Sequence, residues 1–304
     1  MKRFLGVDGG GSSTVALIAD QSGRVIGEGR AGPSNVADLA TFEKNLREAV
    51  DAAGAADGEF ESVCFGFSGG VEQKGLIARE MVKADRYSIV HDASIALTGA
   101  TGGAPGVVVI AGTGSIAFGR NTRDRTARAG GWGYAFGDEG SAYDIVRQAL
   151  RAALRLEEGW GRATALHAAL LEAAGTASAN DVLHRFYSPA YPRARIAALA
   201  ILIDELARSG DAVAIDILNG AAQSLATIAS AVRAQLFRAD ENAMISYSGG
   251  AFSSSQLLER FKMLVELDGA NLFTTPRFRP VEGALIEAFR AAGLDIIPHT
   301  DVSG

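Results

Sequence analysis

The sequence predicts an α/β fold organised in two domains. Its length of 304 residues is about twice that of an average domain. Short β-prone segments separated by glycine turns open the chain, and segments alternating between strand and helix follow them. After about residue 120 the chain is rich in alanine and leucine, which predicts a mostly helical second half.

The first half is predicted to begin with a meander of three antiparallel strands. Helical spacing of apolar residues starts at Leu39. Strands and helices then alternate, which indicates a mixed sheet with helices on both faces. The predicted strands are 3–8, 15–20, 24–29, 62–67, 87–91 and 106–111. Three helices are predicted: one that begins at Leu39, one over about 74–84, and one that begins at Ala93.

The second half is predicted to contain five helices before its first strand. The apolar faces of the helices within 193–237 fit either core packing or a homodimer interface. The predicted helices are 139–157, 163–174, 179–187, 193–208, 211–237, 253–267 and 281–292, and the predicted strands are 243–247 and 271–275.

The composition of the chain excludes or disfavours several classes of function and of binding site. The net charge of −6 disfavours binding to nucleic acid or to an anionic membrane. The single cysteine, Cys64, excludes an intramolecular disulfide and a multi-cysteine metal site. The longest apolar run, near 197–203, is far shorter than the ~20 residues that span a bilayer. With no secretion signal at Met1, we expect a cytoplasmic protein.

The 37 glycines gather in short clusters, and three of these clusters follow predicted strands. The first runs from Asp8 to Thr14, between two strands. Glycines let the backbone approach a ligand, and amide and hydroxyl groups then surround phosphate oxygens. Asp8 at the strand end could hold Mg²⁺ through water. An ordinary hairpin has the same pattern, so this turn alone leaves both interpretations open.

The second cluster, from Ala111 to Ser115, also joins two strands, and two such turns are a less probable coincidence than one. The third, Ser248-Gly249-Gly250, joins a strand to a helix N-terminus. Glycines there permit flat packing against a base and ribose, and the helix end favours a nearby anion.

The three turns, in this order and spacing, resemble the phosphate-1, phosphate-2 and adenosine motifs of the actin, heat-shock-protein and sugar-kinase superfamily. The segment Gly130–Tyr143, which contains Gly-Trp-Gly and Gly-Asp-Glu-Gly-Ser, is similar to the BadF/BadG/BcrA/BcrD ATPase family and its N-acetylglucosamine kinase branch.

This resemblance implies two ribonuclease-H-like, actin-like domains, each with a mixed five-stranded sheet, separated by a nucleotide and sugar cleft. The N-terminal domain is expected to comprise 1–116 and 283–304, with the phosphate-1 loop and the catalytic aspartate. The C-terminal domain is expected to comprise 117–282, with the sugar-contacting turn and the adenosine motif.

The resemblance also implies the site. Asp92 would accept the proton of the attacking sugar hydroxyl, and Asp8 would hold Mg²⁺ through water. The expected ATP-binding residues are Gly9, Gly10, Gly11, Ser12, Ser13, Gly112, Thr113, Gly114, Gly249 and Gly250. The expected sugar-binding residues are Asn35, Asp92, Ser115, Gly131, Trp132, Gly133 and Asp138.

The implied activity is ATP-dependent phosphorylation of an amino sugar, with N-acetylglucosamine to its 6-phosphate as first choice. Glucosamine and N-acetylmuramic acid are the alternatives, because Ile116 stands where a relative that phosphorylates N-acetylglucosamine has a polar residue. His91, beside Asp92, is interpreted as structural, and Cys64 as an inert core thiol.

Three other functions share parts of this pattern. An activator ATPase of acyl-CoA dehydratases holds an iron–sulfur cluster with two cysteines per subunit, and this chain offers only Cys64. A sugar-responsive repressor needs a helix-turn-helix before the first loop, where seven residues precede Asp8. A sugar sensor without kinase activity is disfavoured because Asp8, Asp92 and both loops are present.

Overall fold

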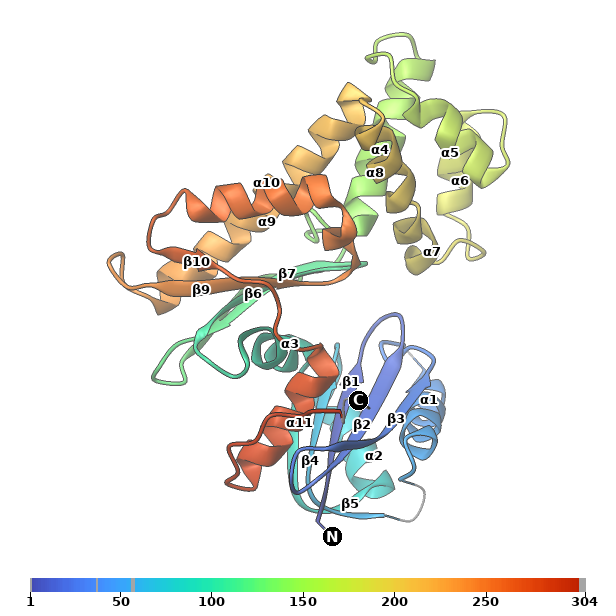
Figure 1. Cartoon of the computed structure of the whole chain (residues 1–304). Helices are drawn as coiled ribbons and strands as arrows, with labels where there is room; N and C mark the ends of the chain where they lie inside the picture. Colours follow the sequence, from blue (N-terminus) through green and yellow to red (C-terminus); the bar gives the residue numbers. More distant parts are fainter. Residues whose placement is uncertain (1, 37, 56–57, 301–304) are drawn as a thin grey trace. The chain divides into compact units, whose positions relative to one another are not determined.

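The structure is a computed structural model that describes residues 2–36, 38–55 and 58–300. The chain divides into two compact units, one formed by Met1–Val108 with Thr275–Gly304 and the other by Val109–Thr274. Within the described residues there are two five-stranded sheets, and Figure 1 labels most of their strands and the helices around them.

The first sheet begins with a meander of three strands, as the sequence predicts. Strand β1 pairs antiparallel with β2, β2 pairs antiparallel with β3, and β4 and β5 then add parallel to β1. The strand order is β3-β2-β1-β4-β5, with bounds Arg3–Gly9 (β1), Thr14–Asp20 (β2), Val25–Ala31 (β3), Glu59–Phe67 (β4) and Lys83–His91 (β5).

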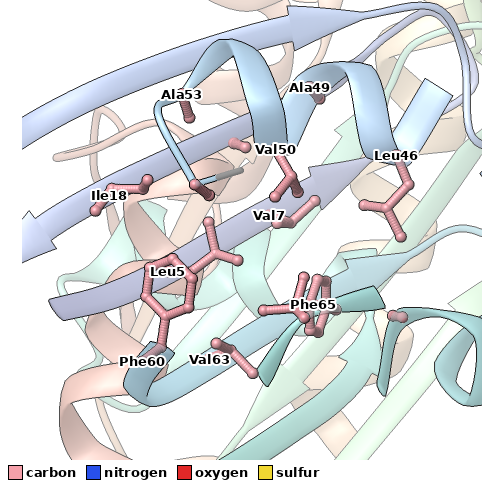
Figure 2. Close-up of a cluster of buried hydrophobic side chains, with 14 of the residues drawn as sticks. Leu5, Val7, Ile18, Leu46, Ala49, Val50, Ala53, Phe60, Val63 and Phe65 are labelled. Atoms are coloured by element: carbon pink, nitrogen blue, oxygen red, sulfur yellow. The ribbon is translucent and has the colours of Figure 1, made fainter. Parts of the chain in front are cut away.

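Helices cover both faces of this sheet. Helices α1 (Leu39–Ala52) and α2 (Val71–Met81) pack on one face, where Leu5 and Val7 meet Leu46 on α1 and Phe65 on β4. Figure 2 shows these side chains pointing toward one another between the helix and the strands. Strand residues alternate between faces, so the neighbours of Leu5 and Val7 face the opposite side.

The opposite face is covered by α11 (Pro280–Ala291), which packs on β1 and β4 and on α3 (Asp92–Thr101). There Phe4 meets Phe289, with ring centroids 4.6 Å apart. A Cβ at Gly6 would lie 2.5 Å from the backbone nitrogen of Leu285. Glycine at this position therefore permits the close approach of α11 that seals the sheet.

The second sheet carries a layer of long helices. Helix α9 (Ala212–Leu236) packs on β7, β8 and α10 (Ser255–Glu266), and α4 (Ala142–Glu157) joins α9 to the shorter helices. The strand order is β10-β9-β6-β7-β8, with bounds Gly106–Ala111 (β6), Ser115–Arg120 (β7), Thr126–Gly130 (β8), Ala243–Ser248 (β9) and Asn271–Phe273 (β10). The shorter helices are α5 (Leu166–Ala174), α6 (Ala179–Phe186), α7 (Arg193–Ala198) and α8 (Ala200–Arg208).

Helix α9 is, among the described residues, the one helix long and apolar enough to cross a bilayer when length and composition alone are considered. It buries Leu218 and Leu225 inside its unit. Near its C-terminus it also buries Arg233, whose Nε donates to Asn271 Oδ1 at 2.8 Å. Both features are those of a core helix in a globular unit.

Several elements differ from their predicted bounds. Strand β5 begins at Lys83, where the sequence predicted the end of a helix, and β8 forms where no strand was predicted. Helix α4 begins after Ser141, whose Oγ accepts the amide of Asp144 as an N-cap. The single helix predicted over 193–208 is two helices, α7 and α8, that meet at Leu199.

The chain divides between the two compact units after Val108 and after Thr274, and the expected boundaries after residues 116 and 282 stay a prediction. Strand β6 is hydrogen-bonded between β9 and β7, so the residues before 116 contribute to the second sheet. The segment before α11 lies on α3, where the amides of Arg277 and Phe278 donate to the carbonyls of Ala100 and Gly99. The nucleotide and sugar cleft expected between the two units stays a prediction.

Candidate active site

The first unit gathers its candidate residues at one edge of its sheet. Because β1, β4 and β5 are parallel, their carboxyl ends lie together: Gly9 pairs with Phe67, and Phe67 pairs with His91. Asp8 and Asp92 therefore occupy the same edge, where α/β sheets bind ligands.

Asp8 lies in an environment that opposes its ionisation. Burial raises the pKa of Asp8 to about 7, and the negative charge of Asp92 adds to this shift. A cation beside Asp8 would relieve both effects. In the described part of the chain no group of three or more His, Cys, Asp or Glu residues could hold a metal ion. One carboxylate suits Mg²⁺, which keeps several waters and takes its other ligands from phosphates.

Asp92 is the first residue of α3, directly after the N-cap residue His91. Its Oδ1 accepts the amide of Ala93 at 2.8 Å and lies 2.6 Å from His91 Nδ1. His91 was interpreted as structural, and its capping role agrees with this, although it also contacts the expected base.

The phosphate-1 loop and Asn35 are held together through the backbone. The Gly10 carbonyl accepts the amides of both Ser34 and Asn35, at 3.0 and 3.1 Å. Thr14 Oγ1 donates to the Gly32 carbonyl at 2.8 Å and also contacts Ser34 Oγ. Asn35 is thus fixed beside the loop, and the remaining loop hydroxyls, Ser12 and Ser13, follow Gly11.

The glycines of these loops are not equivalent. A Cβ at Gly9 would lie 2.6 Å from the Phe67 ring, so packing requires glycine there. A Cβ at Gly11, Gly112 or Gly250 would have no protein atom within 4 Å. Packing does not explain these three, whereas close approach of a ligand to the backbone would.

The second unit brings the phosphate-2 loop and the adenosine turn together. Loop residues Gly112–Gly114 join β6 to β7, and the Gly112 carbonyl accepts the amide of Ala142 at 2.9 Å. Gly249, which follows β9, has a φ of +99°, and a Cβ there would lie 2.4 Å from the Ala111 carbonyl oxygen. The two turns therefore pack backbone against backbone, which only glycine at 249 allows.

Asp138 ties the phosphate-2 loop to the turn that follows β8. It has a positive φ of 61°, it is 5% exposed, and its carboxylate accepts the Ser115 amide at 3.2 Å. A Cβ at Gly114 would lie 2.9 Å from Asp138 Oδ2. Burial raises the pKa of Asp138, and the Ser115 amide opposes that shift.

Trp132 is displayed on the same turn. It is 67% exposed, and the Arg128 guanidinium lies 5.0 Å from its ring centroid. Gly131 donates its amide to the Ser115 carbonyl at 2.9 Å, and Ile116 packs against it, since a Cβ at 131 would lie 2.9 Å from Ile116 Cδ1. Gly133 has open space around it and a φ of +81°.

Sequence reasoning missed one part of the first unit's edge. The turn Ser68-Gly69-Gly70 follows β4 at the same carboxyl end, and Ser68 Oγ accepts Asn35 Nδ2 at 3.3 Å. Lys74 on α2 donates to the Ser68 carbonyl at 2.7 Å. A strand followed by Ser-Gly-Gly and a helix also occurs at Ser248, and that repetition is the signal that could have found this turn.

Two α/β units, each with a mixed five-stranded sheet, give this chain the two-domain fold of the actin-like sugar kinases. The family model of the BadF/BadG/BcrA/BcrD ATPase family matches residues 5–288, and the chain belongs to this family.

Two relatives and one solved structure are similar to this chain along most of its length. The chain is 32% identical over 281 residues to an N-acetylmuramic acid/N-acetylglucosamine kinase of Clostridium acetobutylicum, covering 88% of this chain and 92% of the relative. It is 31% identical to an N-acetyl-D-glucosamine kinase of Dictyostelium discoideum, over 84% of this chain and 87% of the relative. A crystal structure from Chromobacterium violaceum matches with a TM-score of 0.77 and 25% identity, covering 94% and 98% of the two chains.

Proposed function

We propose that this protein is an ATP-dependent hexosamine kinase, with N-acetylglucosamine to N-acetylglucosamine 6-phosphate as its reaction. The observation that carries the proposal is the shared edge of the first sheet, where Asp92 and Asn35 lie beside the phosphate-1 loop. The kinases of Clostridium acetobutylicum and Dictyostelium discoideum, both similar along most of this chain, support the same reaction class.

In this reaction the sugar hydroxyl oxygen forms a bond to the γ-phosphorus of ATP, and the bond between that phosphorus and the bridging oxygen of ADP breaks. Asp92 takes the hydroxyl proton and later releases it to solvent. Phosphoryl transfer passes through a loose transition state, so orientation and charge neutralisation provide most of the catalysis. The hydrogen bond from the Ala93 amide holds Asp92 Oδ1 in place for this role.

ATP would be held by loops of both units: Gly9, Gly10, Gly11, Ser12 and Ser13 of the first, and Gly112, Thr113, Gly114, Gly249 and Gly250 of the second. The open space at Gly11, Gly112 and Gly250 supports this assignment. Asp8 would hold Mg²⁺ through water, and Mg²⁺ when bound neutralises phosphate charge.

The sugar would be held by Asn35 and Asp92 in the first unit and by the turn that follows β8 in the second. Trp132 offers an exposed aromatic face of the kind that packs on a sugar ring. Asp138 is largely covered, so we assign it to orienting Ser115 and the phosphate-2 loop as well as to the sugar side. Glucosamine and N-acetylmuramic acid are the alternative acceptors.

A second candidate function is that of an ATPase or sensor of the same family without sugar kinase activity. An iron–sulfur activator would require two cysteines per subunit, and Cys64 is fully buried and its pKa is raised by burial. Because kinases are similar to this chain along most of its length, the kinase proposal stands ahead of the ATPase or sensor. We further propose a cytoplasmic protein whose substrates are small molecules.

The test is a coupled ADP-release assay of the purified protein with Mg-ATP and N-acetylglucosamine, glucosamine and N-acetylmuramic acid in turn. The proposal expects sugar-dependent ADP release, strongest with N-acetylglucosamine, and a hexosamine phosphate by mass spectrometry. ADP release that no sugar stimulates would support the ATPase or sensor instead.

A further inference from the structure

Lys74 is a buried lysine at the edge of the sheet that holds the candidate base. The residue is 4% exposed, on α2 directly behind the turn Ser68-Gly69-Gly70. Its ammonium donates to the Ser68 carbonyl at 2.7 Å and lies 5.5 Å from the centroid of the Phe42 ring. Buried lysines are rare unless they are paired, so this charge calls for a specific explanation.

No carboxylate in the described part of the chain forms an ion pair with Lys74, so its Ser68 hydrogen bond leaves two of the three ammonium donors unassigned. Burial lowers the pKa of Lys74, and the negative charge of Asp92 opposes that shift. The titratable groups that share this edge are Asp8, His91 and Asp92, and the two carboxylates favour a nearby cation.

The turn that Lys74 holds is under local constraint. Gly69 and Gly70 are consecutive residues with positive φ, at 63° and 62°. Gly70 is the N-cap of α2 and provides no side chain to cap the helix. Side-chain support therefore comes from Lys74 on one side and from Asn35, through Ser68 Oγ, on the other.

We propose that Lys74 is a positioning residue of the kinase site, acting through Asp92 and through the turn Ser68-Gly69-Gly70. Its positive charge attracts the negative charge of Asp92 across this edge, and its hydrogen bond fixes the turn against which Asn35 is placed. This inference rests on the proposed function for its catalytic part, while the positioning of the turn stands on the structure alone.

The test compares Lys74→Met, which keeps the length of the stem and removes the charge, with Lys74→Arg, which keeps the charge. Lys83→Met, an exposed lysine of the same unit at the start of β5, is the matched control. In the hexosamine kinase assay we expect Lys74→Met to lower kcat about tenfold or more, part of the 10²–10⁴ that a general base contributes. KM for ATP should change little, and Lys74→Arg should recover part of kcat.

Wild-type-like kcat for Lys74→Met at unchanged melting temperature would overturn the inference while leaving the kinase proposal intact. A readout without substrate covers the case in which no sugar is phosphorylated. Hydrogen–deuterium exchange should become faster in the peptide around residues 66–72 in Lys74→Met and stay unchanged in Lys83→Met. Unchanged exchange in Lys74→Met would also overturn the positioning role.

Discussion

Asp8 and Asp92 lie at the carboxyl edge of one sheet, and the negative charge of Asp92, added to burial, raises the pKa of Asp8 to about 7. A buried carboxyl group whose ionisation is opposed by a neighbouring charge lowers the stability of the fold and is typical of functional sites. The arrangement provides one group suited to a cation and one suited to a proton.

The first prediction concerns the stability of the folded chain. The pKa of Asp8 is raised from 3.8 in the unfolded chain to about 7 in the folded one, so the folded state binds its proton more tightly. The stability that this proton provides is present below about pH 4 and is lost as pH rises through about 7. Asp8→Asn should therefore raise the free energy of unfolding at pH 8 by up to about 4 kcal/mol.

Urea unfolding of wild type and Asp8→Asn at pH 4 and pH 8, without divalent cations, measures this difference. At pH 4 the two proteins should be nearly equally stable. A stability difference of the same size at both pH values would mean that Asp8 ionises normally in the folded protein.

The second prediction separates glycines that serve ligands from glycines that serve packing. Gly112→Ala adds a Cβ into open space, so the melting temperature should stay unchanged while KM for ATP rises severalfold. Gly249→Ala forces a positive φ of 99° and a clash with the Ala111 carbonyl, and should destabilise the protein by roughly 1–3 kcal/mol. Equal ATP affinity of Gly112→Ala and wild type would remove this loop from the nucleotide site.

The third prediction concerns Trp132. A second tryptophan of the same unit, Trp160, has similar surroundings and serves as its control. Trp132 and Trp160 are 67% and 65% exposed, and each lies 5.0 Å from an arginine, Arg128 and Arg155 respectively. Trp132→Ala should raise KM for the hexosamine about tenfold, the loss of roughly 1.4 kcal/mol of binding. KM for ATP and the melting temperature should remain unchanged.

Trp160→Ala is the control, because it removes an equally exposed indole from a turn that carries no expected substrate contact. It should leave both KM values at the wild-type level. If the two variants behave alike, Trp132 has no special relation to the sugar.

The sequence was sufficient for the parts of the fold that local patterns determine. The meander of β1 to β3 follows from short β-prone segments separated by glycine turns, which the sequence around Asp8 contains. The bounds of β5 and the break at Leu199 depend instead on tertiary pairing. Lys83 adds to β4 through the register of Glu59 with Lys83, a long-range contact that no local window contains.

Some residues of the candidate site can likewise be predicted from the sequence, whereas others depend on tertiary contacts. Asp8 and the loops are predicted by strand ends followed by glycines, and Asp92 is predicted by the family resemblance. Lys74 was not found, because its importance comes from burial behind the turn Ser68-Gly69-Gly70, and a lysine in a helix is usually exposed. The burial of Asp138 likewise depends on its contact with Gly114, which is distant in the sequence.

The central claim is that Asp92 takes the proton of a hexosamine hydroxyl during phosphoryl transfer from ATP. The most direct measurement is the kcat of Asp92→Asn with N-acetylglucosamine and Mg-ATP, beside Asp85→Asn, an exposed aspartate of β5, the strand that directly precedes Asp92. The account predicts that Asp92→Asn lowers kcat by about 10²–10⁴ while nucleotide binding persists, and that Asp85→Asn is unaffected. An Asp92→Asn enzyme that keeps most of its turnover would contradict it.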